Sequence, residues 1–182
     1  MLDLHFDPFP TLKTERLILR RPVDSDVPNL FRIRSDADVM RYIPRTLAQT
    51  HDDVRTYLAK LDEMTSRADG LTWAIATADE PERLMGTIGF VNIYKEHHRS
   101  EVGYALHPDY QRKGYVQEAI VRVLDYGFGE LGFHTVEAIV DPANEASSSL
   151  LEKNGFIQEA HFRENRIFEG RFLDCLVYTR WK

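Results

Sequence analysis

The sequence predicts an α/β fold in which helices cover a mixed sheet. Three observations support this prediction. The expected elements run strand, two helices, three strands, helix, strand, helix and two strands, so both kinds occur along the whole chain. The last two strands follow one another directly, as an antiparallel pair does. With 182 residues the chain can bury one good core, and we therefore expect a single domain, residues 1–182.

The first half of the chain provides an opening strand, two helices and two further strands. The opening strand, RLILRRP, ends at its proline. The second helix has Thr50 as its expected cap and acidic residues in its first turn. LTWAIAT and LMGTIGFVNIY read as strands, and the turn-like DEPE stands before the second of them. In order, these elements are expected over residues 16–22, 24–34, 49–66, 71–77 and 84–94.

The second half begins with the strand EVGYALH, residues 101–107, whose two faces differ. Val102, Tyr104 and Leu106 make one face bulky and apolar, and the other is nearly bare except for the carboxylate of Glu101. A long amphipathic helix follows, then the buried strand TVEAIV, then the short helix ASSSLLEKN with Gly155 as a left-handed cap. FIQEAHF and RFLDCLVYTRW form the closing pair. These elements are expected over residues 114–131, 135–140, 146–154, 156–162 and 171–181.

Composition narrows the classes of partner. The formal net charge of −6 argues against nucleic acid, because phosphate binding needs a basic surface. No stretch approaches the 18 or so apolar residues of a membrane span, and the acidic, proline-containing start lacks the pattern of a signal peptide. The single cysteine, Cys175, excludes an internal disulfide and suits a reducing compartment. We therefore expect a cytoplasmic protein, and the sequence leaves monomer and homodimer open.

The stretch HPDYQRKGYVQEA, residues 107–119, is typical of an anion site. A strand ends near His107 and a helix begins around Gly114. The first turn of a helix leaves N–H groups without partners, and its dipole adds partial positive charge. These groups bind phosphate or pyrophosphate where the backbone can come close, which a glycine permits. Arg112 and Lys113 add charge, and the alternative is an ordinary solvated turn into a helix.

The run QRKGYV, Gln111 to Val116, resembles the Q/R-x-x-G-x-G/A signature of the GNAT acetyltransferases, with valine at the last position. LKTERLILRRP, EVGYALHPDYQRKGYVQEA and NEASSSLLEKNGF are similar to the ribosomal-protein N-acetyltransferase (RimJ/RimL-like) branch, in the same order and at fitting separations. The resemblance extends from about Leu12 to the C-terminus. It implies the acyl-CoA N-acyltransferase fold, a mixed and mostly antiparallel sheet flanked by helices, and acetyl-CoA as co-substrate without a metal.

The resemblance also implies roles for residues. In this family the loop binds the pyrophosphate of acetyl-CoA, and the asparagine of the third block contacts the cofactor. Acetyl transfer requires the neutral amine, so a carboxylate that removes a proton, directly or through water, is useful. Glu101 is therefore the expected general base, with a surface glutamate as the alternative. The expected cofactor-binding residues are Gln111, Arg112, Lys113, Gly114, Tyr115, Val116, the backbone of Tyr104, Ala105 and Leu106, and Asn144.

The general acid follows from the same resemblance. Many relatives carry a tyrosine in the short helix that reprotonates the departing thiolate, and this chain has Leu151 there. A nearby serine has been suggested as the donor in the family, so Ser147 is the candidate. Ser148 is a close rival, and helix capping alone accounts equally well for Asn144 and Ser147.

The acceptor amine is constrained by its pKa. An α-amine titrates near ~8 and a lysine near ~10.4, so neutralising the lysine costs about 3 kcal/mol more. One carboxylate is therefore better matched to an α-amine, in agreement with enzymes that acetylate ribosomal-protein N-termini, and the acidic chain suits a basic peptide. A small amine remains an alternative. So does a non-catalytic acyl-CoA-binding module, or, less well supported without a P-loop pattern, a nucleotide-phosphate enzyme.

Three further motifs are interpreted as structural. GFGELG, residues 127–132, matches the dinucleotide fingerprint but closes a helix instead of opening one, so it is interpreted as helix termination. His97 and His98 lack further ligands at metal spacing and are expected in a loop, with no metal site. Cys175 alternates with Leu173 and Val177 in the last strand and is expected to be a buried thiol instead of a nucleophile.

Overall fold

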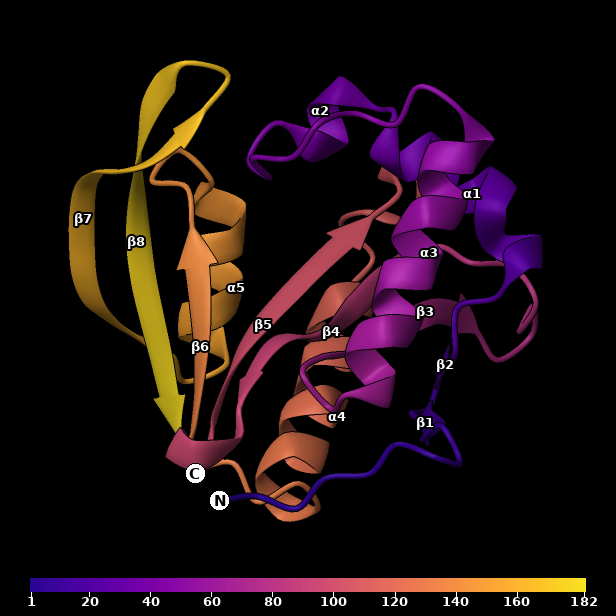
Figure 1. Ribbon diagram of the computed structural model, residues 1–182, viewed down its shortest axis with the longest axis horizontal. Coiled ribbons are helices and arrows are strands. Elements are labelled where there is room, and N and C mark those ends of the chain that lie inside the picture. The colour runs from indigo at the N-terminus through magenta and orange to yellow at the C-terminus, as the bar shows by residue number, and fades with distance from the viewer.

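The computed structural model describes residues 1–182 and contains one sheet of eight strands in the order β1-β2-β3-β4-β5-β6-β8-β7 (Figure 1). Neighbouring strands are antiparallel except β5 and β6, which run parallel. The expected mixed, mostly antiparallel sheet is confirmed. The strands are β1 Leu12–Lys13, β2 Leu17–Arg20, β3 Leu71–Thr77, β4 Gly86–Tyr94, β5 Arg99–Leu106, β6 Thr135–Val140, β7 Ile157–Phe168 and β8 Arg171–Trp181.

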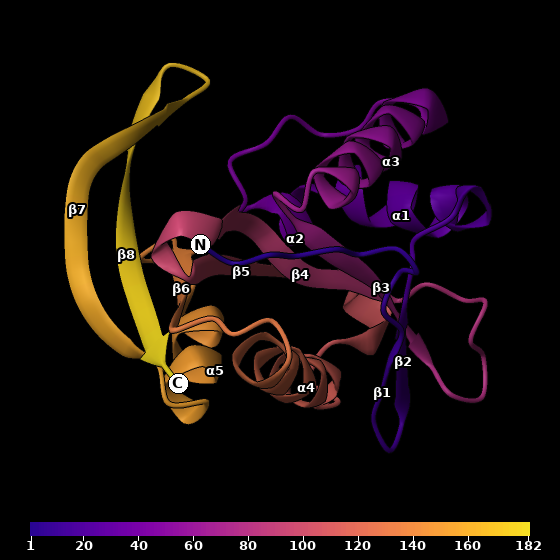
Figure 2. The same ribbon diagram turned by 60° about the horizontal axis from the view of Figure 1, so that its bottom comes forward.

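Helices cover both faces of the sheet (Figure 2). α1 and α3 lie against one face, and α4 and α5 lie against the other. None of the helices combines the length and apolar character that crossing a membrane requires. The α-helices are α1 Val27–Arg34, α2 Ala37–Met40, α3 His51–Ser66, α4 Tyr115–Gly129 and α5 Glu145–Lys153, and the 3-10 helices are η1 Asp24–Asp26, η2 Lys95–His97 and η3 Pro108–Tyr110.

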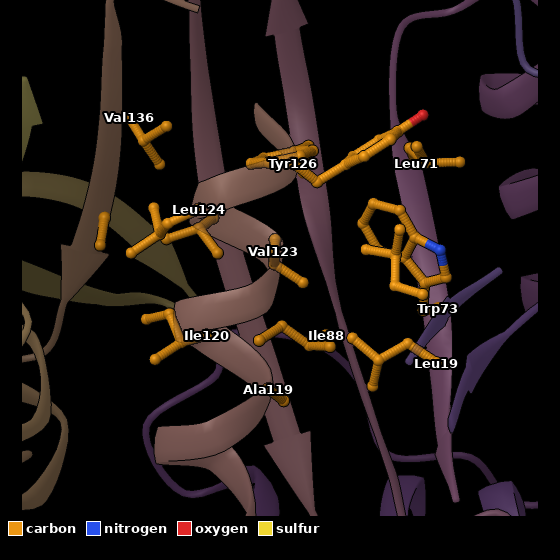
Figure 3. Close-up of a cluster of buried hydrophobic side chains, with 14 of the residues drawn as sticks. Leu19, Leu71, Trp73, Ile88, Ala119, Ile120, Val123, Leu124, Tyr126 and Val136 are labelled. Atoms are coloured by element: carbon orange, nitrogen blue, oxygen red, sulfur yellow. The ribbon is translucent and has the colours of Figure 1, made fainter. Parts of the chain in front are cut away.

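The larger hydrophobic core lies between the sheet and α4 (Figure 3). Trp73 and Ile88 from the strands pack in this cluster with Ile120 and Val123 of α4, and all four are fully buried. The apolar stripe at three- and four-residue spacing explains why α4 presents one face to the sheet. Ala74, next to Trp73, points to the opposite face and joins the smaller core under α1 and α3. This packing fixes α4, and therefore its N-terminus, relative to β5.

The structure differs from the sequence-based elements mainly in short or exposed segments. The expected helix over residues 24–34 begins as η1, and α1 starts one residue before Pro28, a residue that favours the first helical turn. Two short elements, β1 and α2, were not expected. β7 extends to Phe168 instead of residue 162, because its mostly exposed side chains lack the alternation that marks a half-buried strand.

Most of the other structural interpretations are confirmed. α4 ends at Gly129, so GFGELG is a helix end, and a side chain at Gly127 would come within 2.6 Å of the Phe90 ring. Gly155 is left-handed with φ of 78°, as expected for a helix cap. Cys175 is a free thiol and is buried.

β5 and β6 separate part of the way along their length, and this separation organises the site. Their parallel pairing covers only three positions, Arg99 to Glu101 opposite Thr135 to Glu137. Beyond it the two strands diverge (Figure 1). We call the two segments that no longer pair with each other, residues 102–106 of β5 and 138–140 of β6, the fork. β5 leads through η3 to the N-terminus of α4, and β6 leads directly to the N-terminus of α5.

Candidate active site

The N-terminus of α4 provides a row of unpaired N–H groups. Gly114 is its N-cap in the left-handed conformation, φ 79°, and no side chain caps this end. The N–H groups of Tyr115, Val116 and Gln117 therefore lack a protein acceptor. A side chain at Gly114 would be strained by that φ, and Arg112 shares the left-handed conformation with φ of 59°. With the helix dipole, this backbone can hold a phosphate group.

The loop before α4 is held by residues distant in sequence. Arg16, just before β2, donates from Nε to Glu118 Oε2 at 2.7 Å and from Nη1 to the Lys113 carbonyl at 3.2 Å. Its guanidinium lies 4.9 Å from the centre of the Tyr115 ring. Gln111 donates from Nε2 to the Leu106 carbonyl at 3.0 Å, which ties the loop back to β5. The expected anion loop is thus braced at both ends.

The ionised form of Glu118 is stabilised by this bracing. Burial alone would raise the pKa of its carboxyl, but hydrogen bonds from Thr14 and Arg16 outweigh burial and hold the pKa below its ordinary value. A carboxyl with a lowered folded pKa contributes stability above its unfolded pKa. That stability is lost as the pH falls through the folded value.

We therefore expect Glu118→Gln to lower the melting temperature at pH 7 by at most about 4 °C. The ion pair is with a half-exposed arginine and is worth about 1 kcal/mol or less. The gap between variant and wild type should close as the pH falls toward about 3, below the ordinary glutamate range. Melting curves at both pH values test this. An equal gap at both would mean that the carboxylate charge of Glu118 contributes nothing.

At the fork, β5 and α5 are joined by two hydroxyl groups. Tyr104 Oη lies 2.7 Å from Ser147 Oγ, and either can be the donor. Asn144 caps α5 by accepting from the Ser147 N–H at 3.2 Å, so the capping interpretation of Asn144 is confirmed as geometry. Leu151 is fully buried in the larger core, and the hydroxyl groups of Ser147 and Ser148 lie in the first turn of α5.

The backbone of β5 at the fork faces two ways. The N–H of His107 donates to Met85 of the segment before β4, and hydrogen bonding alternates along an antiparallel pair. The peptide groups of Ala105 therefore face β4, whereas those of Tyr104 and Leu106 face the fork. The Leu106 carbonyl already accepts a hydrogen bond from the Gln111 side chain. The Tyr104 peptide and the Leu106 N–H remain as backbone partners for a bound molecule.

Glu101 stands at the point where the fork begins. Asn92 of β4 donates from Nδ2 to Glu101 Oε2 at 2.8 Å, which leaves Oε1 without a protein donor. Glu137 lies opposite in register on β6, but it is bound by Arg99 at 2.7 Å. Glu101 has no cation partner. Of the two neighbouring carboxylates, Glu101 is the one free to accept a proton or bind a cationic group.

The structure brings most of the sequence-predicted residues to the fork. Glu101 begins it, Tyr104 and Leu106 line it, and Ser147 and Asn144 lie at the N-terminus of α5. The side chains of Arg112 and Lys113 are exposed on the loop. Val116 is half-buried, and its side chain packs on the larger core. Its side chain therefore points away from the loop, and its N–H is one of the unpaired N–H groups in the first turn of α4.

Three further groups were not found from the sequence: Asn92, the Arg16–Glu118 pair and the hydroxyl of Tyr104. Arg16 and Glu118 are 102 positions apart, so no local spacing could pair them. Asn92 contacts Glu101 through the register of β4 with β5, which includes an irregularity between Phe90 and Asn92. The alternation of side chains along β5 did indicate that Tyr104 points away from Glu101. It did not indicate that the Tyr104 hydroxyl contacts Ser147 of α5.

A surface hollow of about 480 Å³ lies between α4 and the segment around β1. Lys13, Thr14 and Arg16 line it together with Val121 and Arg122. It reaches Gly114 and Gln117 at the N-terminus of α4 but none of Glu101, Tyr104 or Ser147. The hollow is therefore distinct from the fork.

Comparison with known proteins gives the class. Residues 16–157 match the model of the acetyltransferase (GNAT) domain. The chain belongs to the GNAT acetyltransferase family, and it is an N-acetyltransferase. It is 37% identical over 175 residues to the uncharacterized N-acetyltransferase YoaA of Bacillus subtilis, covering 94% of this chain and 96% of that protein. A GNAT acetyltransferase structure from Bacillus anthracis superposes with a TM-score of 0.83 at 30% identity, covering 94% and 98% of the two chains.

More distant relatives carry names for different acceptors. One is the ribosomal protein uS5 alanine N-acetyltransferase of Escherichia coli, 23% identical over 91% of this chain and 88% of that protein. Another is the spermidine N(1)-acetyltransferase of Vibrio cholerae, 25% identical over 87% and 89%. A structure of RimL, a ribosomal L7/L12 α-N-protein acetyltransferase in complex with coenzyme A, shares the fold with a TM-score of 0.84 at 17% identity, over 94% and 98% of the chains.

Proposed function

We propose that this N-acetyltransferase transfers the acetyl group of acetyl-CoA directly to the α-amine of a protein N-terminus. The observation that supports the proposal best is the uncapped N-terminus of α4 behind Gly114, directly beside a fork that begins at a free carboxylate. The first feature suits a pyrophosphate and the second suits an amine. The coenzyme A complex of RimL, which has the same fold, is consistent with this ligand.

The residues present match the chemistry of acetyl-CoA. Three free N–H groups of the first turn would hold the pyrophosphate, with Gly114 leaving the approach open, because nothing lies closer than 3.5 Å to a side chain built there. The peptide groups of Tyr104 and Leu106 would hold the amide-containing arm along the fork. When bound, acetyl-CoA supplies an acetyl group activated as a thioester. The amide nitrogen of Asn144 stays available, since only its oxygen caps α5.

Glu101 is the general base of this proposal. Its Oε2 is fixed by Asn92, so Oε1 is free to take the proton of the acceptor amine, directly or through water. Glu137 is less suited because Arg99 neutralises it. On the other side of the fork Ser147 is the proton donor, and its contact with Tyr104 favours it over Ser148.

The acceptor is proposed to be an α-amine because of its lower cost of neutralisation. Relative to a lysine side chain, an α-amine saves about 3 kcal/mol. A net charge of −6 suits a basic polypeptide, such as a ribosomal protein. The name of the uS5 alanine N-acetyltransferase supports this class of acceptor, and the name of the spermidine relative supports the competing class of small polyamines.

An acceptor panel tests the proposal. Release of the CoA thiol is measured with basic peptides that begin with alanine or serine, with the same peptides blocked at the N-terminus, and with spermidine and an aminoglycoside. We expect turnover with the free peptides. Blocking the N-terminus should lower the rate of acetylation at least about 100-fold, because only the more basic lysine amines then remain. Turnover confined to spermidine or the aminoglycoside would reject the N-terminal acceptor. Binding of acetyl-CoA without turnover on any amine would reject catalysis.

A further inference from the structure

Tyr104 is the residue at the fork whose side chain has no assigned role. It is on the apolar face of β5 and packs against the larger core. Its hydroxyl reaches Ser147 on α5, 43 positions further along the chain, at 2.7 Å. Ser147 is the only protein partner of that hydroxyl. Two hydroxyl groups from different elements therefore meet where β5 has separated from β6.

The direction of this hydrogen bond follows from the chemistry of the two groups. A phenol is the stronger acid, titrating near ~10, so it is the better donor, and a buried donor without an acceptor is costly. If Tyr104 donates, Ser147 Oγ accepts, and its own proton is free for a second acceptor. The Ser147 N–H is already bound to Asn144. The first turn of α5 thus keeps the hydroxyl proton of Ser147 as a donor toward the fork.

We propose that Tyr104 and Ser147 form a two-hydroxyl chain that delivers a proton to the sulfur leaving group. The inference rests on the proposed function. As the carbon–sulfur bond breaks and its electron pair stays on sulfur, Ser147 gives its hydroxyl proton to that sulfur. Tyr104 gives its phenolic proton to Ser147 Oγ, and water then restores the proton of Tyr104. Ser147 is the catalytic residue, and Tyr104 is the positioning residue that orients and reloads it.

The surroundings of Tyr104 agree with this role. Burial raises the pKa of its phenol, and the hydrogen bond with Ser147 opposes that shift only in part. The phenol therefore stays protonated at neutral pH and remains a donor. The chain also explains how the site functions with Leu151 in the short helix. The proton donor comes from β5, through Ser147, instead of from a tyrosine on α5.

Tyr104→Phe tests the inference, with Ser147→Ala, the double variant, and Tyr126→Phe as matched control. Tyr126 is another buried tyrosine, placed on α4 and away from the fork. We expect kcat to fall about 10- to 100-fold in Tyr104→Phe and by at least as much in Ser147→Ala. The double variant should be no slower than Ser147→Ala, because the two hydroxyls act as one unit. Tyr126→Phe should retain wild-type turnover.

A second readout does not depend on turnover. The pKa of the thiol of bound coenzyme A is measured from the ultraviolet absorbance of its ionised form. A donor aimed at the sulfur favours the ionised form, so Tyr104→Phe and Ser147→Ala should both raise this thiol pKa, while Tyr126→Phe should not. The stabilisation of the fold by acetyl-CoA should persist in every variant.

The outcomes separate this inference from the proposed function. Wild-type turnover in Tyr104→Phe, or effects of the two single variants that multiply, would overturn the two-hydroxyl chain while the enzyme remains an acetyltransferase. An unchanged thiol pKa in Tyr104→Phe would also overturn it. If no amine is acetylated although coenzyme A binds, the proposed acceptor fails, and the thiol titration still decides the role of Tyr104.

Discussion

Replacing Glu101 by glutamine is expected to lower kcat by about 10²- to 10⁴-fold, the range that general base catalysis contributes. Glutamine keeps the shape of the side chain, and its carbonyl can still accept from Asn92, but it cannot take a proton from the amine. Binding of acetyl-CoA should persist, since Glu101 lies before the point where β5 separates from β6 and away from the N-terminus of α4. Steady-state kinetics and melting curves with acetyl-CoA measure the two effects.

The pH dependence gives this prediction a second measurement. Without a base, only the amine that is already neutral in solution can react, and that fraction rises about tenfold per pH unit up to an α-amine pKa near ~8. The deficit of Glu101→Gln should therefore shrink as the pH is raised from 6 toward about 8.

Glu137→Gln is the matched control for Glu101→Gln. This substitution changes the carboxylate that lies opposite Glu101 in register. Glu137 is already paired with Arg99, so kcat should stay within a few-fold of wild type. Wild-type turnover in Glu101→Gln, or an equal loss in Glu137→Gln, would remove Glu101 from the mechanism.

Gly114→Glu is expected to abolish measurable binding of acetyl-CoA, with a loss of affinity above about 100-fold. Two effects add. A left-handed non-glycine residue costs about 1–2 kcal/mol, so the loop tends to leave its conformation. The new carboxylate also places a negative charge where the pyrophosphate would bind. The measurement is the rise in melting temperature with acetyl-CoA, which saturating ligand produces in the wild type and the variant should lack.

Gly170→Glu separates the ligand effect from the backbone effect. Gly170 lies in the turn between β7 and β8 with φ of 75°, close to the 79° of Gly114, and has no atom within 4 Å of an added side chain. It therefore carries the same change of charge and a similar strain. We expect Gly170→Glu to lower stability while the stabilisation by acetyl-CoA stays intact. Retained binding in Gly114→Glu would place the pyrophosphate elsewhere.

Local patterns in the sequence predicted the elements that are buried and regular. The bounds of β3, β6 and β8 agree with the expected residues, because alternating or continuous apolar runs there match a half-buried or buried strand. The anion loop was predicted for a similar reason, since Gly114 and the helix that follows are contiguous. β7 was predicted too short, because an exposed edge strand carries little pattern.

The rest of the site depends on contacts between distant segments. The fork exists because pairing of β5 with β6 stops after Glu101, and no residue type marks that point. Arg16 meets Glu118 only after β2 and α4 pack together. Tyr104 meets Ser147 only because α5 lies on the same face of the sheet as the apolar side of β5. These contacts follow from register and packing, which local spacing does not determine.

Amide hydrogen exchange of the wild type, with and without saturating acetyl-CoA, tests whether the first turn of α4 and the fork hold the cofactor, because it reports which N–H groups the ligand covers. We expect slowed exchange at Tyr115, Val116 and Gln117, with protection also at Tyr104 and Leu106 on β5. Unchanged exchange at these positions, or protection confined to Lys13 and Thr14 beside the hollow between α4 and β1, would contradict this placement of the cofactor.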